Sequence, residues 1–155
     1  MFTVNGNGAD IWGTHDQFNY VHQAATTSGT IVAQVTSESN TSTNGKAGVM
    51  FKQSTTAGTN YMLIAVSPQG VTKVEYDFNG SYTEATYTLP DVWMKLAWEG
   101  GKFTAYLSSN GTTWTEELSK TLAITSPATV GIFECSHNAS LLGTATFANV
   151  SYTSP

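Results

Sequence analysis

The chain has 155 residues and a formal net charge of −5 at pH 7, and only 11% of its residues are charged. All six basic residues are lysines, so the chain lacks the guanidinium fork that binds phosphate in two places at once. This composition argues against nucleic acid as a partner and against binding or insertion at an anionic membrane.

The first twenty residues combine tight turns with two aspartates. Residues 5–8 read Asn-Gly-Asn-Gly, which favours positive φ, and residues 1–4 show neither a leader pattern nor a membrane span. Asp10 and Asp16 flank a turn at residues 12–14. Carboxylates and backbone carbonyls suit a hard cation, so these two aspartates are calcium candidates, and capping of the turn is the alternative.

Short runs of β-branched and aromatic residues follow, each closed by Gly, Asn, Ser or Pro. The clearest runs are residues 30–36, 61–66, 71–76 and 102–107. Period-two alternation recurs along the chain, and no window of a dozen residues has apolar residues at helical spacing. The pattern predicts an all-β protein of about a dozen strands, arranged as a two-sheet antiparallel sandwich with no substantial helix.

Residues 93–117 are the clearest local unit. Three apolar runs are separated by Gly100-Gly101 and Asn110-Gly111, which predicts a three-stranded meander. Trp98 shares a strand face with Met94 and Leu96, so it is expected in the core. Cys135, the single cysteine, alternates with Phe133 and is expected to be a buried, unreactive thiol.

Seven phrases in the chain, taken in order, resemble bacterial extracellular modules with the concanavalin A-like (laminin-G-like) jelly-roll fold. They are Gly8-Ala9-Asp10-Ile11-Trp12-Gly13, residues 16–21, residues 29–35, Lys46-Ala47-Gly48-Val49-Met50, residues 108–114, Ser136-His137-Asn138 and residues 144–150. Such modules are often appended to polysaccharide-active proteins. The resemblance implies one domain over residues 1–155, in a secreted, extracellular protein. It is either a module of a longer chain or a chain exported by another route.

The chain departs from that family pattern in three places. Lys52 stands where an arginine is common, and Ala148 stands where an acidic residue is common. A strand that usually precedes the Phe2-Thr3-Val4 segment has no counterpart. A free strand edge exposes unpaired backbone groups, so pairing between copies into a homo-oligomer is expected as an alternative role.

Catalysis finds weak support in the residues. Glycoside hydrolases on this fold carry Glu-x-Asp followed closely by a second glutamate, and Glu75-Tyr76-Asp77 supplies only the first half. With no second glutamate, the three residues are read as a solvated strand face. We therefore expect no enzymatic activity, and a glycoside hydrolase is the alternative.

Glycan binding is the function that the residues favour. Trp12, Tyr76 and Trp93 are the candidates for stacking on sugar rings. Tyr20 and His22 share one side of a strand with Phe18, which is either an inner face or the lining of a groove. Lys52 and His137 are the candidates for binding hydroxyl or carboxylate groups. The sequence thus predicts a non-catalytic carbohydrate-binding-like module with no required cofactor, and a self-assembling surface protein is the alternative.

Overall fold

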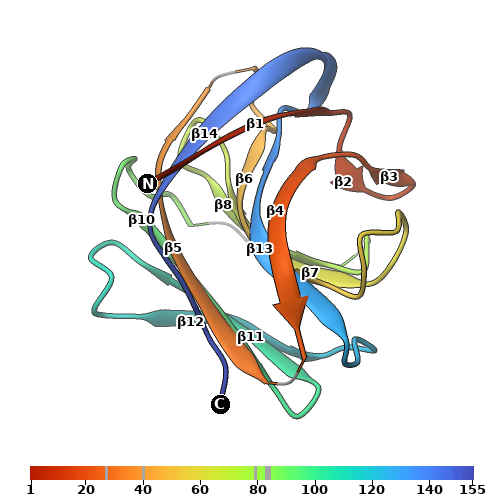
Figure 1. Ribbon diagram of the computed structural model, residues 1–155. Coiled ribbons are helices and arrows are strands. Elements are labelled where there is room, and N and C mark those ends of the chain that lie inside the picture. Colours follow the sequence, from red (N-terminus) through yellow and green to blue (C-terminus); the bar gives the residue numbers. More distant parts are fainter. Residues whose placement is uncertain (27, 40, 79, 83–84) are drawn as a thin grey trace.

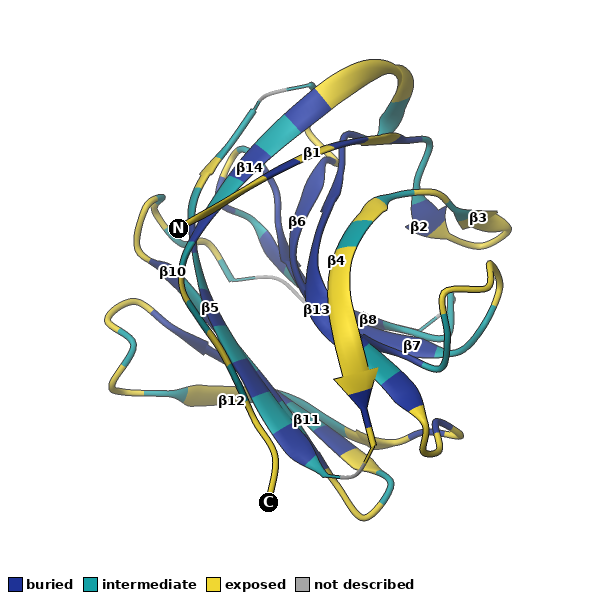
Figure 2. Ribbon diagram, viewed as in Figure 1, coloured by how far each residue is buried: buried dark blue, intermediate teal, exposed yellow. Residues whose placement is uncertain are grey.

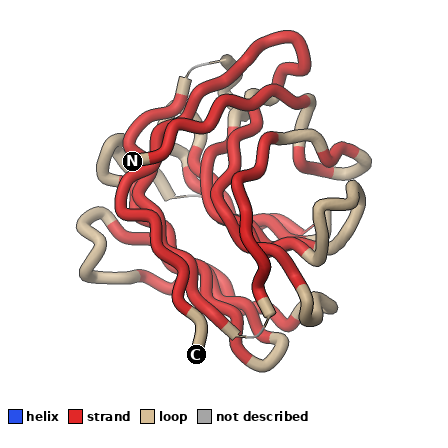
Figure 3. Tube along the Cα trace, viewed as in Figure 1, coloured by secondary structure: helices blue, strands red, loops and turns tan. Residues whose placement is uncertain are grey.

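The computed structural model describes residues 1–155 except residues 27, 40, 79 and 83–84. The described residues form fourteen strands and no helix (Figure 3), so none of them forms a helix long and apolar enough to cross a bilayer. Two six-stranded sheets face one another, and a separate two-stranded hairpin lies beside them (Figure 1). The predicted all-β sandwich is confirmed.

The first sheet, here called the β5 sheet, contains the chain's N-terminal strand and its longest strand. All of its pairings are antiparallel. Its strands, in spatial order, are β1 (Phe2–Gly8), β14 (Asn138–Thr153), β5 (Gly29–Glu38), β10 (Val92–Glu99), β11 (Lys102–Ser108) and β12 (Thr115–Thr121).

The second sheet, here called the β6 sheet, is also antiparallel throughout. Its strands, in spatial order, are β4 (Asn19–Ala25), β13 (Ala128–Cys135), β6 (Lys46–Lys52), β7 (Tyr61–Val66), β8 (Thr72–Tyr76) and β9 (Gly80–Tyr82). The separate hairpin consists of β2 (Ile11–Trp12) and β3 (His15–Asp16).

The predicted meander is confirmed as β10, β11 and β12. The connection between β10 and β11 is the two-residue loop Gly100-Gly101, and both glycines have positive φ, at 56° and 82°. These angles are the ones that a tight hairpin turn requires and that residues with a side chain avoid. Glycine at both positions therefore sets the register of the meander.

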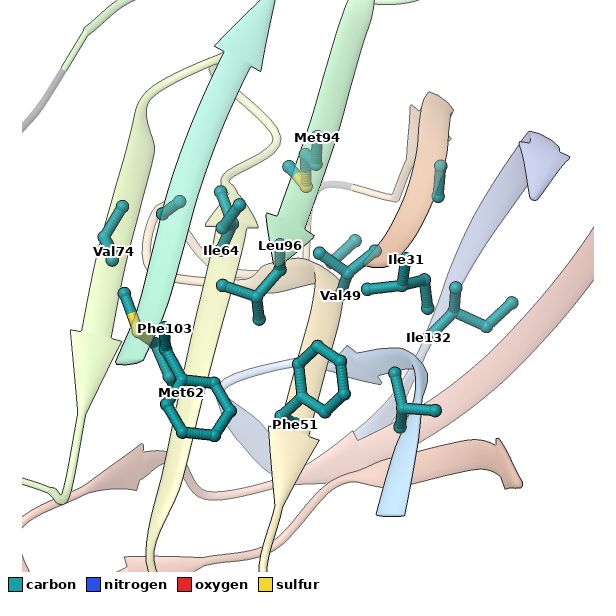
Figure 4. Packing of buried hydrophobic residues seen from close by; sticks show 14 of the residues in the cluster. Ile31, Val49, Phe51, Met62, Ile64, Val74, Met94, Leu96, Phe103 and Ile132 are labelled. Atoms are coloured by element: carbon teal, nitrogen blue, oxygen red, sulfur yellow. The ribbon is translucent and has the colours of Figure 1, made fainter. Parts of the chain in front are cut away.

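The main core fills the space between the two sheets. Strand β10 contributes Met94 and Leu96, and the facing strand β6 contributes Phe51 (Figure 4). Trp98 of β10 belongs to the same cluster. The Phe51 ring lies 5.8 Å from the Trp98 ring and 5.6 Å from the Phe103 ring, both edge-on. The expectation that Trp98 is a core residue is therefore confirmed.

Strand β6 is buried on both of its faces (Figure 2). Its odd-numbered residues Val49 and Phe51 face the inter-sheet core, while Met50 belongs to a second apolar cluster. Strand β7 divides in the same way. In a simple two-layer sandwich, one face of each strand is exposed to solvent. Because both faces of β6 and β7 are buried, another part of the chain must cover the outer face of the β6 sheet.

Candidate functional site

The outer face of the β6 sheet carries its own apolar cluster beneath the β2–β3 hairpin. Ile11 from the hairpin is fully buried in it, together with Met50, Phe133 and Cys135. The Cys135 thiol donates a hydrogen bond to the Gln17 carbonyl, with 3.3 Å between sulfur and oxygen. Burial raises the pKa of this thiol to about 11, so the prediction of a buried, unreactive cysteine is confirmed.

Lys46, at the start of β6, fastens one end of the hairpin to the sheet. Its Nζ lies 2.6 Å from Asp10 Oδ1 and 3.1 Å from Glu75 Oε1. It also donates to the Ile11 carbonyl at 3.2 Å. Both Lys46 and Glu75 are buried, so this ammonium group neutralises two carboxylates that have little access to water.

Lys52, at the other end of β6, fastens the second arm of the hairpin. Its Nζ lies 2.8 Å from Asp16 Oδ2 and donates to the Thr59 carbonyl at 2.9 Å. Asp16 Oδ2 also accepts a hydrogen bond from the Gly58 amide at 2.6 Å. One ion pair thus joins β6, the hairpin and the loop between β6 and β7.

Asp10 connects the hairpin to His137 as well. His137 Nε2 lies 3.3 Å from Asp10 Oδ2, and its Nδ1 lies 3.4 Å from the Ser42 hydroxyl. Burial alone would raise the pKa of Asp10, but the hydrogen bond and charge of Lys46 hold that pKa below its ordinary value. Burial raises the pKa of Glu75 despite the pull of Lys46. Asp10 is therefore the ionised centre of this group.

A hollow of about 240 Å³ opens beside the Lys52–Asp16 pair. The rings of Tyr20 and His22 stack along one side of it, with centroids 4.8 Å apart, and Phe18 continues the row. A second hollow of about 500 Å³ lies between the hairpin and the β6–β7 loop and shares Asp16 with the first. Phe18, Tyr20 and His22 therefore line a groove, which decides between the two alternatives left by the sequence.

Asp16 has an acceptor that nothing in the described chain uses. Its Oδ2 holds Lys52 and Gly58, but its Oδ1 is buried and has no hydrogen-bond partner among the described residues. Asp16 lines both hollows, so its carboxylate lies beside the space that a ligand would occupy, while Oδ1 itself is buried. A buried acceptor without a partner is uncommon and requires a physical explanation.

Besides Asp10, Asp16 and His137, four predicted glycan-binding residues lie around this face of the molecule. Tyr20, His22 and Lys52 line the first hollow, although Lys52 is only 1% exposed and is already bound by Asp16. Trp12 is exposed on the hairpin, next to Gly13 of the second hollow. Residues from the hairpin, β4 and β6 therefore meet on one side of the β6 sheet (Figure 1).

Two predicted stacking residues lie elsewhere. Tyr76 pairs with Met62 and packs against the inter-sheet core, with Lys120 Nζ 5.0 Å from its ring centre, so it is not part of this face. Its neighbour Glu75 takes the outer face, where it is buried rather than solvated as expected. Trp93 lies on the outer face of the β5 sheet against Gly111.

The outer face of the β5 sheet holds an aromatic group that the sequence reasoning missed. Lys95 Nζ lies 4.3 Å from the centre of the Tyr106 ring and 4.5 Å from that of Trp114. Tyr106 is the direct cross-strand partner of Lys95. The meander register, read with its period of two, is the signal that would have found Tyr106 beside Lys95.

The residues considered for calcium binding and for catalysis lie in a different environment from the one expected. Asp10 and Asp16 each carry a lysine ammonium group, which already balances their charge. Glu75 is bound by Lys46, and Asp77 accepts a hydrogen bond from the Tyr61 amide at 3.1 Å. Calcium at the two aspartates stays a prediction, as does the absence of enzymatic activity.

Comparison with known proteins identifies the fold of the chain but neither its family nor its function. No family model matches the chain, and no curated protein matches it in sequence. Among solved structures, a functionally unknown protein from Saccharomyces cerevisiae has a TM-score of 0.77 and 20% identity, over 99% of this chain and 87% of that one. The GH43 protein BlXynB from Bacillus licheniformis (K247S mutant) has a TM-score of 0.76 and 15% identity, over 99% of this chain.

A third similar structure is the carbohydrate-binding module CBM66 from Bacillus subtilis. It has a TM-score of 0.54 and 20% identity, over 85% of this chain and 78% of that one. This chain spans only 33% of the BlXynB chain. These likenesses confirm the predicted jelly-roll sandwich, a fold shared by carbohydrate-active proteins, and such a fold hosts several functions.

Proposed function

We propose that this chain is a non-catalytic module that binds a glycan in the groove between the β2–β3 hairpin, strand β4 and the β6–β7 loop. The observation that carries the proposal is the position of Asp16 at the junction of the two hollows, with its Oδ1 unpartnered among the described residues. Sugar hydroxyls are neutral donors, and a carboxylate oxygen fixed by Lys52 and Gly58 is a preorganised acceptor for one of them.

The rings beside Asp16 offer the apolar surface on which a sugar ring can stack. Phe18, Tyr20 and His22 form a row along β4, and His22 is exposed at its end. Flat rings pack against the apolar C–H face of a sugar, while polar groups select among its hydroxyls. Trp12 extends the aromatic surface onto the hairpin.

The likeness to CBM66 supports the same proposal, since that protein is a carbohydrate-binding module on this fold. The match to one third of the BlXynB chain supports a module of a longer protein. The proposal further places this protein outside the cell, where it acts on polysaccharide. An open groove of this size favours weak binding at each site, so attachment to a polymer depends on several contacts at once.

The test is an affinity-gel screen against neutral glucans, xylans, fructans and acidic polysaccharides, followed by calorimetry on the best ligand. We expect the native chain to be retarded by at least one polymer. His22→Ala and Trp12→Ala change exposed residues, so they should fold normally and bind roughly tenfold more weakly, which is about 1.4 kcal/mol. Asp16→Asn should weaken binding as well.

Trp114→Ala, on the opposite sheet, is the matched control and should bind as the native chain does. Equal retardation of all the variants would contradict this location, and retardation by no polymer would contradict the function. Release of reducing sugar that is lost in Glu75→Gln would show an enzyme instead.

Self-association is the second candidate, because β1 forms one end of the β5 sheet. Phe2 on β1 is 47% exposed and Leu142 on the adjacent β14 is 65% exposed. A free strand edge with apolar side chains favours pairing with another copy. Light scattering after size exclusion should then give twice the monomer mass, returning to one mass in Phe2→Lys; a single monomer mass at every concentration would exclude this role.

A further inference from the structure

Two glutamates face the space between the sheets at one end of the core. Glu38 is the last residue of β5 and pairs with Ala145, which lies in the main core. Glu134 follows Val130 and Ile132 on β13 at the same period of two, and both of those residues also lie in the core. Residues paired across strands, or two apart along one strand, point to the same side. Both carboxylates therefore enter the interior.

Neither carboxylate has a partner among the described residues. All four oxygens of Glu38 and Glu134 are buried without a hydrogen bond, and Glu134 is 0% exposed. Lys46 and Lys52, the two buried lysines, are bound to other acids. Isolated carboxylates in an apolar interior are costly unless they are paired, protonated or bound to a metal.

The backbone around the two carboxylates is built to leave them room. A Cβ on Gly143 would collide with Glu134 Oε1, and one on Gly45 would lie 2.7 Å from Glu38 Oε1. Neither glycine is among the described glycines with a positive φ, so backbone conformation does not require glycine here. Gly143 also lies inside β14, where glycine is normally unfavourable. The two carboxylates therefore lie directly against backbone positions that have no side chain.

We propose that Glu38 and Glu134 bind a calcium ion between the two sheets. Calcium takes six to eight oxygen ligands, mixing carboxylates with backbone carbonyls and water. The two carboxylates supply up to four of these oxygens, and the Ser42 carbonyl lies beside Gly45 on the Glu38 side. One divalent cation would neutralise both charges and join β5 to β13. The site differs from the Asp10 and Asp16 pair and does not depend on glycan binding.

The alternative to calcium binding is that Glu38 and Glu134 are both protonated and uncharged. Burial, and then the charge of Glu134, raises the pKa of Glu38 to about 10, and burial raises the pKa of Glu134 to about 8. Without a cation, both groups would be largely protonated at neutral pH. The two states differ in their response to calcium, which makes them separable.

The experiment uses the purified chain, stripped with chelator and titrated with calcium chloride at pH 7.5. We expect one equivalent of calcium to bind in calorimetry and the unfolding temperature to rise with calcium concentration. Glu38→Gln and Glu134→Gln keep the side-chain shape and remove the charge. Each should lose more than about tenfold in calcium affinity without losing stability in the absence of calcium.

Glu116→Gln, at an exposed position on β12, is the matched control and should bind calcium as the native chain does. If Glu134→Gln does not fold, the half-buried Glu38→Gln answers the same question. No calcium binding by the native chain would overturn the proposal and favour the neutral pair. Binding that is unchanged in the glutamine variants would also overturn it.

Discussion

Replacing Lys46 with methionine should lower the free energy of unfolding by about 3–5 kcal/mol, because it leaves the buried Glu75 and the partly buried Asp10 without their cation. Methionine matches the length of the lysine stem, so packing in the outer cluster is preserved. Asp10 and Glu75 then lose the ammonium group that lies 2.6 Å and 3.1 Å from their oxygens. Urea unfolding followed by tryptophan fluorescence measures the loss.

The stability of the Lys46→Met variant should also depend on pH in a different way from that of the native chain. In the native chain the pKa of Asp10 is below its ordinary value of 3.8, so its stabilisation is present at neutral pH and is lost as the pH falls through the folded value. Without Lys46, burial raises the pKa of Asp10 and raises further the already elevated pKa of Glu75. The variant's folded state then binds protons more readily than its unfolded state, and its stability rises towards acidic pH. The difference in unfolding free energy between the native chain and Lys46→Met should therefore become smaller below about pH 5.

Lys102→Met is the control for both measurements, since Lys102 is exposed at the β10–β11 turn. Its effect should stay within about 0.5 kcal/mol. A Lys46→Met protein as stable as the native chain at neutral pH would mean that the ion group does not hold the hairpin.

Replacing Phe51 with alanine should cost about 3–5 kcal/mol of unfolding free energy. Phe51 is fully buried and packs edge-on against Trp98 and Phe103 of the opposite sheet (Figure 4). Removing its ring leaves a cavity that the two rigid sheets cannot close. The urea concentration at the unfolding midpoint should fall. The slope of unfolding free energy against urea concentration should stay unchanged, because the surface exposed on unfolding is nearly the same.

Phe2→Ala removes an equal ring from an exposed position on β1 and should cost less than about 1 kcal/mol. Similar losses in the two variants would contradict the placement of the core between the sheets. A global loss in Phe51→Ala also separates this core from the outer cluster, where the proposed glycan binding should be separable from the stability of the sandwich.

The local pattern of the chain was enough to predict the strands and much of the core. The turn at Gly100-Gly101 and the alternation around Trp98 follow from backbone sterics and side-chain period, both of which act over a few residues. Cys135 was placed correctly by the same rule. It nevertheless lies in the outer cluster rather than between the sheets, a distinction that alternation does not make.

The site residues were predicted less well because their environment is set by distant segments. Tyr76 was expected on an outer surface, yet its pairing with Met62 places it at the core. Glu75 was read as solvated, yet it is buried with Lys46, which is 29 residues away in the chain. A charged residue in a strand reads as exposed unless its partner is known, and nothing local identifies the partner.

By itself the sequence determined the all-β class, the antiparallel meander and the alternation of side chains between the two faces of each strand, since these depend on neighbours along the chain. Only the tertiary structure decided that the β2–β3 hairpin folds over the β6 sheet, that Lys46 and Lys52 neutralise Asp10, Glu75 and Asp16, and that the carboxylates of Glu38 and Glu134 are buried without a partner among the described residues. Burial and charge pairing are properties of whole layers in contact, and residues far apart in the chain acquire them only when the sheets close.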